Sequence, residues 1–205
     1  DHPKPLIILI GGASGVGKTS VSVALANHLR ISRIVSTDAI RQVMRLMIAP
    51  DLMPTLHASS YLAWREASAI FPDGPTQVVS AFREQAVRVG VGVRAIIERA
   101  LEENTSIIVD GVHLVPDLVD LSTVADRAIA VWMNLSIDDE KRFSERFRSR
   151  GEKAEKRRAH RYIEHLDNIL EIQAHILETG EAHDIPAFEN TDFEDINVTI
   201  DDDTT

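Results

Sequence analysis

The chain of 205 residues contains no cysteine. This absence excludes disulfides, thiolate-ligated metal sites and cysteine nucleophiles. Long apolar runs are also missing, because no stretch approaches the roughly 20 residues that a membrane-spanning helix needs. The apolar run Leu6–Ile10 is short and leads straight into a glycine-rich loop, so we do not expect it to be a signal peptide. The expected protein is cytoplasmic and has no membrane partner.

An excess of positive charge is lacking as well. The chain has 22 basic and 32 acidic residues, and its net charge of −10 argues against a nucleic-acid partner. Residues 141–161 are the exception, with ten basic and three acidic residues. Such a segment in an acidic protein indicates either a solvated helix face or a local site for a polyanion, and its composition leaves both open.

The most informative motif is Gly12-Ala-Ser-Gly-Val-Gly-Lys18-Thr19, which matches the G-x-x-x-x-G-K-[ST] phosphate-binding loop. The backbone of such a loop points N–H groups at phosphate oxygens, and the helix that follows adds its positive dipole end. Lys18 is expected to neutralise the β- and γ-phosphates and to act in catalysis, while the Thr19 hydroxyl ligates Mg²⁺. The motif predicts an ATP site made of Gly12, Ala13, Ser14, Gly15, Val16, Gly17, Lys18, Thr19 and Ser20.

Hydrophobic periodicity predicts strands that alternate with helices. We expect strands at residues 6–10, 33–36, 106–110, 128–135 and 185–188. The expected helices cover residues 20–29, 37–49, 77–103, 138–150 and a final amphipathic stretch from Tyr162 that stops at Gly180, with Gly90 and Gly92 weakening the longest one. The alternation indicates an α/β fold of the P-loop NTPase type, with a parallel five-stranded sheet and helices on both faces.

Residues 1–205 are expected to form one domain with two additions. A helical insertion at about 46–105, broken by prolines in its first part, is interpreted as the acceptor-binding side. The basic segment at about 138–161 is interpreted as an arginine-rich lid that closes over phosphates. Within it Arg146 and Arg150 are the expected catalytic contacts.

Ligands of a parallel sheet bind at the carboxyl ends of its strands, where this chain carries Asp38 and Asp110. Asp38 would accept the proton of an acceptor hydroxyl, unless its carboxylate caps its own helix; Thr37 is an alternative cap. Arg41 lies one turn further on, suited to grip an anionic substrate or simply to pair with Asp38. Asp110 ends an apolar strand and is expected to orient Mg²⁺ beside Thr19, the alternative being a turn residue.

Four stretches together resemble the 2-phosphoglycerate kinase family. They are Gly11–Thr19, Val35-Ser-Thr-Asp-Ala-Ile-Arg-Gln-Val-Met-Arg45, Pro54-Thr-Leu-His-Ala-Ser-Ser-Tyr61 and Ile107-Ile-Val-Asp-Gly-Val-His-Leu-Val-Pro116. The first is shared by many phosphate-loop proteins, whereas the other three are much narrower. The resemblance covers roughly Leu6 to Asp192.

The resemblance implies transfer of the ATP γ-phosphoryl group to the 3-hydroxyl of 2-phosphoglycerate, which gives 2,3-bisphosphoglycerate. ATP and Mg²⁺ are the implied cofactors, and a small anionic molecule is the implied partner. Because that acceptor carries a carboxylate and a phosphate, it needs several cations and neutral donors. The residues expected to bind it are Asp38, Arg41, His57, Tyr61, Arg83 and His113.

Two other functions stay open at this point. One is a P-loop kinase for a different small-molecule hydroxyl, such as that of a sugar nucleotide or an antibiotic. The other is an ATP-binding sensory module without transfer activity. A GTPase switch is disfavoured, because the sequence has no Asn-Lys-x-Asp motif for reading guanine.

Overall fold

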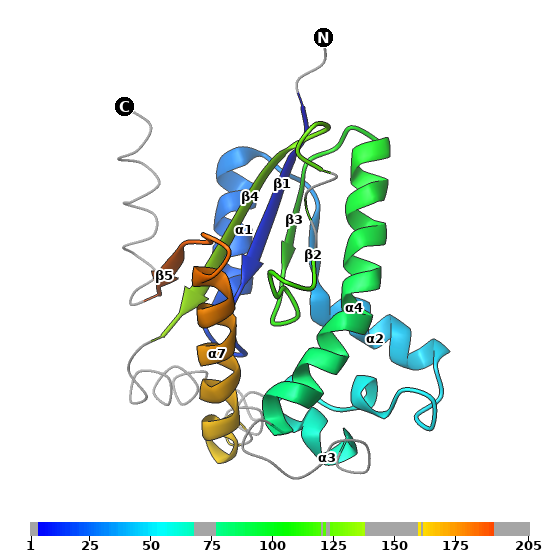
Figure 1. Cartoon of the computed structure of the whole chain (residues 1–205). Helices are drawn as coiled ribbons and strands as arrows, with labels where there is room; N and C mark the ends of the chain where they lie inside the picture. The colour runs from blue at the N-terminus through cyan, green and yellow to red at the C-terminus, as the bar shows by residue number, and fades with distance from the viewer. Residues whose placement is uncertain are drawn as a thin grey trace.

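Five parallel strands carry the fold, in the spatial order β2-β3-β1-β4-β5 (Figure 1). The computed structural model describes residues 4–67, 77–119, 121, 124–137, 160 and 162–190. The strands are β1 (Leu6–Gly11), β2 (Ile34–Ser36), β3 (Ile107–Asp110), β4 (Ile129–Ser136) and β5 (Ala187–Glu189). All five lie within one or two residues of the expected positions, so the predicted parallel sheet is confirmed.

The central strand β1 shows why both faces of the sheet must be covered. Ile7 and Leu9 point to one face and Ile8 and Ile10 to the other, and all four are buried. A strand that is apolar on both sides is typical of a parallel sheet between helical layers. Two apolar clusters form on these faces, and the one around Ile8 and Ile10 continues around the carboxyl end of the sheet.

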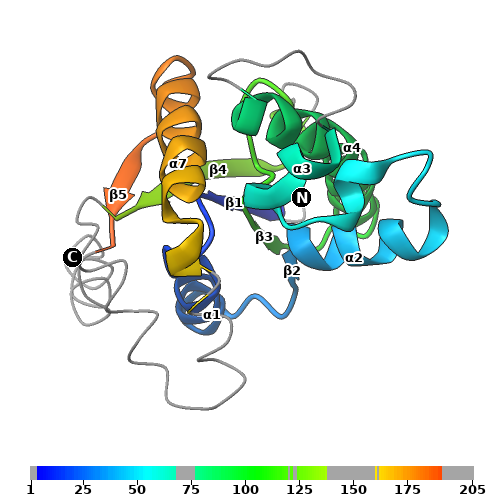
Figure 2. The same cartoon turned by 90° about the horizontal axis from the view of Figure 1, so that it is seen from below.

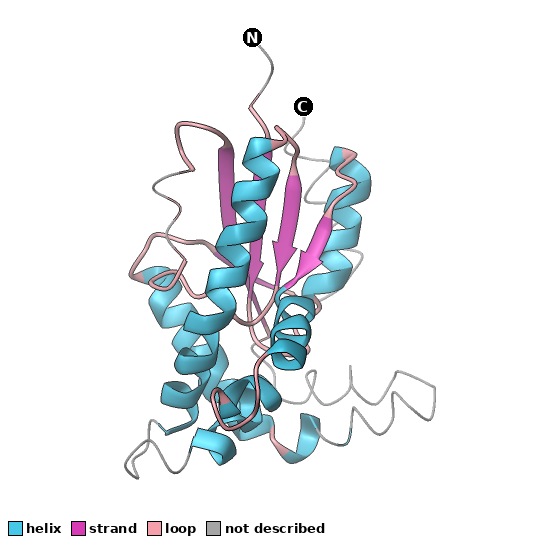
Figure 3. Ribbon diagram, turned by 90° about the vertical axis from the view of Figure 1, so that its right-hand side faces the viewer, coloured by secondary structure: helices cyan, strands magenta, loops and turns pink. Residues whose placement is uncertain are grey.

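The helices supply those two layers. α1 lies on one face, and α4 and α7 lie on the other (Figures 2 and 3). The described helices are α1 (Lys18–Leu29), α2 (Thr37–Met47), α3 (Ala63–Ala67), α4 (Gln77–Glu102) and α7 (Leu166–Glu181), with short 3₁₀ turns η1 (Pro54–His57) and η2 (Ser60–Leu62). None of these helices is long and apolar enough to cross a membrane.

Helix α4 runs without interruption through both of its glycines. A methyl group at Gly92 would overlap Ile40 Cγ2, so the missing side chain lets α2 pack closely against α4. At Gly90 the nearest atom to such a methyl group is the carbonyl oxygen of Leu118 at 3.6 Å, an ordinary contact distance. The two glycines therefore do not interrupt the helix as expected. Gly92 is needed for packing against α2, whereas the space around Gly90 would accommodate a methyl group.

The helix ends one residue beyond the expected stop at Gly180. α7 continues to Glu181, and the chain turns at Asp184, which has a positive φ of 56°. Gly180 lies inside the helix, and a Cβ there would come 2.5 Å from the amide nitrogen of Asn134 on β4. Packing against the sheet, rather than helix termination, explains this glycine.

The parallel strands bring three polar segments to one edge of the sheet. The loop after β1, the start of α2 after β2, and residues 111–113 after β3 all follow carboxyl ends of neighbouring strands. η1, η2, α3 and α4 fall within the 46–105 segment that the sequence predicted to be helical. The predicted helix and lid at 138–161 lie almost wholly outside the described residues, and so do Arg146 and Arg150.

Candidate active site

The loop between β1 and α1 has the backbone of a phosphate cradle. Gly12, Gly15 and Gly17 all adopt positive φ values of 134°, 91° and 92°. Gly17 forms the N-cap of α1, where a left-handed conformation is readily available only to glycine. In the described part of the chain no side chain caps this helix end, so its first N–H groups remain directed at the space that an anion would fill.

Two side chains fix the shape of this loop. Asn190 Nδ2 donates a hydrogen bond to Val16 O at 2.7 Å, and Lys18 Nζ donates one to Ala13 O at 2.6 Å. Burial lowers the pKa of Lys18 to about 8, while the carboxylates of Asp110 and Asp38 act in the opposite direction. The amine is therefore held inside the loop, where a polyanion would favour its protonated form.

Asp110 stands at the end of β3, next to the start of α1. Its carboxylate accepts a hydrogen bond from Ser22 Oγ at 2.8 Å and interacts with the Thr19 hydroxyl. Burial raises the pKa of Asp110, an effect that the Ser22 hydrogen bond and the Lys18 charge partly offset. Asp110, Thr19 and Lys18 thus come together as the sequence predicted, and Asp110 is not a simple turn residue.

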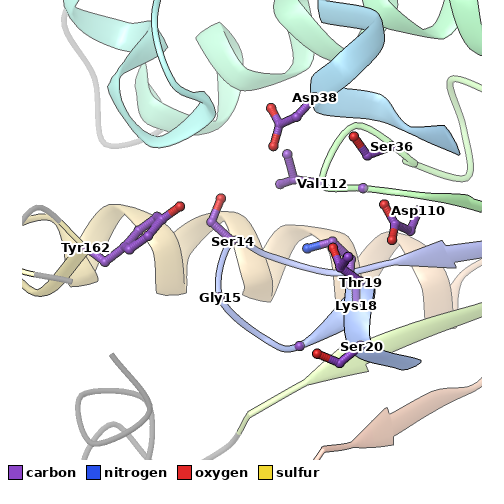
Figure 4. Close-up of a pocket in the computed structure, with 12 residues that line it drawn as sticks. Ser14, Gly15, Lys18, Thr19, Ser20, Ser36, Asp38, Asp110, Val112 and Tyr162 are labelled. Atoms are coloured by element: carbon purple, nitrogen blue, oxygen red, sulfur yellow. The ribbon is translucent and has the colours of Figure 1, made fainter. Parts of the chain in front are cut away.

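These groups line a pocket of about 230 Å³. Figure 4 shows Lys18, Thr19 and Asp110 beside one another, with Asp38 across the pocket. The lining residues are Ser14, Gly15, Gly17, Lys18, Thr19, Ser20, Ser36, Asp38, Asp110, Gly111, Val112 and Tyr162. Six of the nine residues predicted to bind ATP are among them, and the other three, Gly12, Ala13 and Val16, are buried.

The carboxylate of Asp38 is available to a ligand because another residue caps its helix. Ser36 is the N-cap of α2, and its hydroxyl accepts a hydrogen bond from the Ala39 N–H at 3.1 Å. The side chain of Asp38 is 62% exposed and meets Arg41 Nε at 3.3 Å. Of the two roles left open for Asp38, the capping role is excluded, and Thr37 is not the cap either.

A second pocket of about 380 Å³ adjoins the first and shares Ser14, Asp38 and Tyr162 with it. Its other lining residues are Arg41, Gln42, Ser59, Ser60 and Tyr61. Arg41 is buried, and its Nη1 donates to Leu56 O at 2.9 Å and Ala58 O at 2.8 Å. The ring of Tyr61 lies 5.6 Å from that of Tyr162. Asp38 therefore lies between a phosphate pocket and a polar pocket that is lined by the guanidinium group of Arg41.

Two of the predicted substrate residues line neither of these pockets. His57 Nε2 donates to Ile48 O at 2.9 Å, and the ring lines a depression that adjoins the second pocket and shares Arg41, Gln42 and Ser59 with it. Arg83 Nη2 pairs with Asp117 at 2.6 Å, its Nη1 lies 3.1 Å from His175 Nε2, and it lines neither pocket. Both side chains make contacts that hold the fold together.

His113 is also not directed at a ligand. The ring is fully buried, and its two nitrogens lie 2.9 Å from Thr37 Oγ1 and 2.9 Å from Gln85 Oε1. Burial lowers the pKa of His113 to about 4, so the ring is neutral at physiological pH. The predicted role as a direct donor to substrate does not fit this placement.

Several lining residues were missed by the sequence reasoning. Ser36 and Gln42 flank predicted residues on α2, and Tyr162 was counted only as part of an apolar stripe. Gln85 was not singled out either. Its signal was available, since it is a polar residue on the buried face of α4, among Phe82, Ala86 and Val89.

A family model described as "AAA domain" matches residues 8–169. The chain belongs to this family. The matched span includes every residue that lines the first pocket, from Ser14 to Tyr162.

Two curated relatives of this chain are both named 2-phosphoglycerate kinase. The chain is 40% identical over 191 residues to the 2-phosphoglycerate kinase of Pyrococcus horikoshii, and the match covers 93% of this chain and 61% of the relative. It is 40% identical over 190 residues to the 2-phosphoglycerate kinase of Methanothermobacter thermautotrophicus, covering 92% and 62%. The chain thus spans about three fifths of the length of these relatives.

Among solved structures, an uncharacterized protein from Eubacterium ventriosum is similar along nearly its whole length. The two share 19% identity with a TM-score of 0.51, over 97% of each chain. At this identity the likeness concerns the fold, and it agrees with the parallel sheet and its helical layers.

Proposed function

We propose that this chain is an ATP-dependent kinase that transfers the γ-phosphoryl group of ATP to the hydroxyl of a small phosphorylated acid, namely 2-phosphoglycerate, to give 2,3-bisphosphoglycerate. The observation that carries this proposal is the position of Asp38, which lines both the phosphate pocket and the neighbouring polar pocket. The acceptor itself is inferred from the relatives named 2-phosphoglycerate kinase.

In this proposal the phosphate loop binds the triphosphate through its N–H groups, and Lys18 contacts the β- and γ-phosphates. The acceptor oxygen attacks the γ-phosphorus while the bond to the β–γ bridging oxygen breaks and ADP leaves. Asp38 takes the hydroxyl proton. Arg41, whose Nη2 has no hydrogen-bond partner among the described residues, faces the acceptor side and binds one of its anionic groups.

The oxygen donors near Lys18 suit Mg²⁺. Thr19 is exposed and Asp110 lies beside it, a hydroxyl and a carboxylate that fit a hard cation whose other ligands are water and phosphate oxygens. Among the described residues no cluster of three or more His, Asp or Glu side chains could hold a metal ion. When bound, Mg²⁺ would neutralise charge on the β- and γ-phosphates.

Three further parts of the proposal come from the sequence alone. The 46–105 segment would form the acceptor side of the site, and the basic 138–161 segment would act as a lid. Arg146 and Arg150 would then cancel charge on the transferred group. A fourth part rests on the structure: Tyr61 lines the second pocket and its ring lies beside that of Tyr162, so it would form one wall of the acceptor site.

The test is a transfer assay with ATP, Mg²⁺ and a panel of hydroxyl acceptors, in which ADP is measured and the product is identified by phosphorus NMR. We expect 2-phosphoglycerate to be phosphorylated. Asp38→Asn should reduce turnover by about 100-fold or more, because general-base help is lost, and should leave ATP affinity nearly unchanged.

The matched control is Asp126→Asn, which removes an exposed carboxylate in the turn before β4, at the opposite end of the strands. It should retain full turnover. If the chain phosphorylates only acceptors unlike 2-phosphoglycerate, the proposed acceptor is wrong, although the chain is still a kinase. If it binds ATP normally but transfers phosphate to no hydroxyl, a sensory module is favoured.

A further inference from the structure

A continuous chain of buried hydrogen bonds joins the nucleotide side of the site to the acceptor side. It begins at Thr37 on α2, passes through His113 after β3 and continues to Gln85 on α4, and all three side chains are fully buried. Gln85 Nε2 then donates to Thr55 O and, at 3.1 Å, to Ala58 O. Four separate parts of the sequence are thus connected without a solvent-exposed step.

The direction of each hydrogen bond follows from the donors present. The Gln85 amide nitrogen is engaged with two carbonyls, so its Oε1 faces His113 and accepts from the Nε2–H of the ring. His113 Nδ1 is then the acceptor for the Thr37 hydroxyl. This pattern needs a neutral imidazole, and burial lowers the pKa of His113 to about 4, which keeps it neutral.

The chain ends on the residues that hold Arg41. Ala58 O, which accepts from Gln85, also accepts from Arg41 Nη1 at 2.8 Å. At the other end, Gly111 makes room for the Thr37 hydroxyl, because a side chain there would overlap Thr37 Oγ1. The position of the guanidinium is in this way tied to the ends of β2 and β3, which also carry Asp38 and Asp110.

We propose that Thr37, His113 and Gln85 are positioning residues: they fix the Thr55–Ala58 turn, whose carbonyl groups hold Arg41 in the orientation that binds the acceptor. None of the three lines either pocket, so they act through Arg41 rather than by touching a ligand. For the acceptor this inference rests on the proposed function, whereas for the turn it rests on the hydrogen bonds alone.

The matched substitutions are Thr37→Val and Thr55→Val. Both remove a buried hydroxyl and keep the side-chain shape, but Thr55 Oγ1 has no hydrogen-bond partner in the described part of the chain. We expect Thr37→Val to lower kcat/KM for 2-phosphoglycerate at least tenfold, mainly through KM, and to change the KM for ATP less than twofold. Thr37→Ser should restore the acceptor KM, and Thr55→Val should match the wild type.

A second measurement does not depend on activity. Hydrogen–deuterium exchange should be at least tenfold faster in Thr37→Val for the Ala58 and Leu62 amides, which are bonded to Thr55 O and Ser59 O, and unchanged for residues 12–20. If Thr37→Val does not fold, the kinetic and exchange measurements are made on Gln85→Met, for which we expect the same results. A wild type without transferase activity would refute the proposed function, and the exchange result would still decide the positioning role.

Equal loss of ATP and acceptor affinity in Thr37→Val would overturn the inference, because the effect would then be a general loss of structure. An unchanged acceptor KM with unchanged exchange at Ala58 would overturn it as well. The same acceptor defect in Thr55→Val would show that any change in the volume of this region has the effect, which also contradicts the proposal.

Discussion

At the scale of single residues, the lowered pKa of Lys18 predicts that the protein takes up a proton when ATP binds. Its pKa of about 8 in the free protein means that the amine is largely neutral at pH 9. Because a bound triphosphate favours the charged form, ATP binding should take up close to one proton at pH 9 and almost none at pH 7, and affinity should fall about tenfold per pH unit above pH 8. Calorimetry in two buffers of different ionisation enthalpy measures this directly.

The control for Lys18 is Lys18→Arg, whose guanidinium stays protonated over this pH range. Its ATP affinity, whatever its absolute value, should show no proton uptake at pH 9. Wild-type protein that binds ATP at pH 9 without proton uptake would contradict the assignment of Lys18 to the phosphates.

His113 predicts how the stability of the fold depends on pH. In the unfolded chain the ring takes up a proton near pH 6.5, but in the folded protein only near pH 4, so acid favours unfolding between these values. The cause is burial, reinforced by Arg41 and Lys18 and opposed by Asp38. As the pH falls below 6.5, this effect should lower the free energy of unfolding by about 1.4 kcal/mol per pH unit, and by about 3 kcal/mol in total at pH 4.

Urea unfolding at pH 7, 6 and 5 would measure this loss for the wild type and for His113→Gln. Glutamine cannot take up the proton, so the stability gap between the two proteins should narrow steadily as the pH falls. Parallel stability curves would show that the ring is already protonated, or is solvated, in the folded state.

At the scale of elements, the two glycines of α4 should respond oppositely to the same substitution. Gly90→Ala should stabilise the protein by about 0.5–1 kcal/mol, because alanine loses less conformational entropy in a helix and the nearest atom is 3.6 Å away. Gly92→Ala should destabilise it by about 1–3 kcal/mol, because the methyl group would overlap Ile40 on α2.

Thermal or urea unfolding of the two variants beside the wild type is sufficient, since each is the control for the other. Stabilisation by both alanines would mean that α2 does not pack against α4 at this point. Destabilisation by both would mean that the surroundings of Gly90 are tighter than the structure indicates.

These glycines also show where prediction from the sequence succeeds at this scale and where it stops. The bounds of α4 and β3 followed from apolar periodicity and flanking polar residues, which are local signals. The role of Gly180 did not, because its neighbour Asn134 lies on a different element and a glycine near a helix end is more often a stop. Local patterns locate an element, but they do not reveal which of its residues touch another.

The same limit applies to the site. The phosphate loop, Asp38 and Asp110 were predictable because parallel strands bring their carboxyl ends to one edge, so topology alone places them together. The connection from Thr37 to His113 spans 76 residues and the one from His113 to Gln85 spans 28, and no spacing rule links such positions. Arg83 was chosen for its chemistry, but Asp117 and His175 hold its side chain outside both pockets.

At the scale of the whole molecule, the phosphate pocket predicts that bound nucleotide stabilises this chain substantially, although the chain spans about three fifths of the length of its curated relatives. A non-hydrolysable ATP analogue with Mg²⁺ at 100 times its Kd should add about 2.7 kcal/mol. For a protein of this size that amounts to a rise in Tm of about 5–10 °C.

Lys18→Ala should lose most of this rise, whereas Asp38→Asn should retain it, because in the proposed function the loop and Lys18 hold the phosphates and Asp38 takes the proton of the acceptor. The two variants therefore separate nucleotide binding from transfer within one folded protein. A rise in Tm that survives Lys18→Ala would mean that the nucleotide binds elsewhere, and an absent rise in the wild type would mean that this pocket needs parts of the longer relatives to bind ATP.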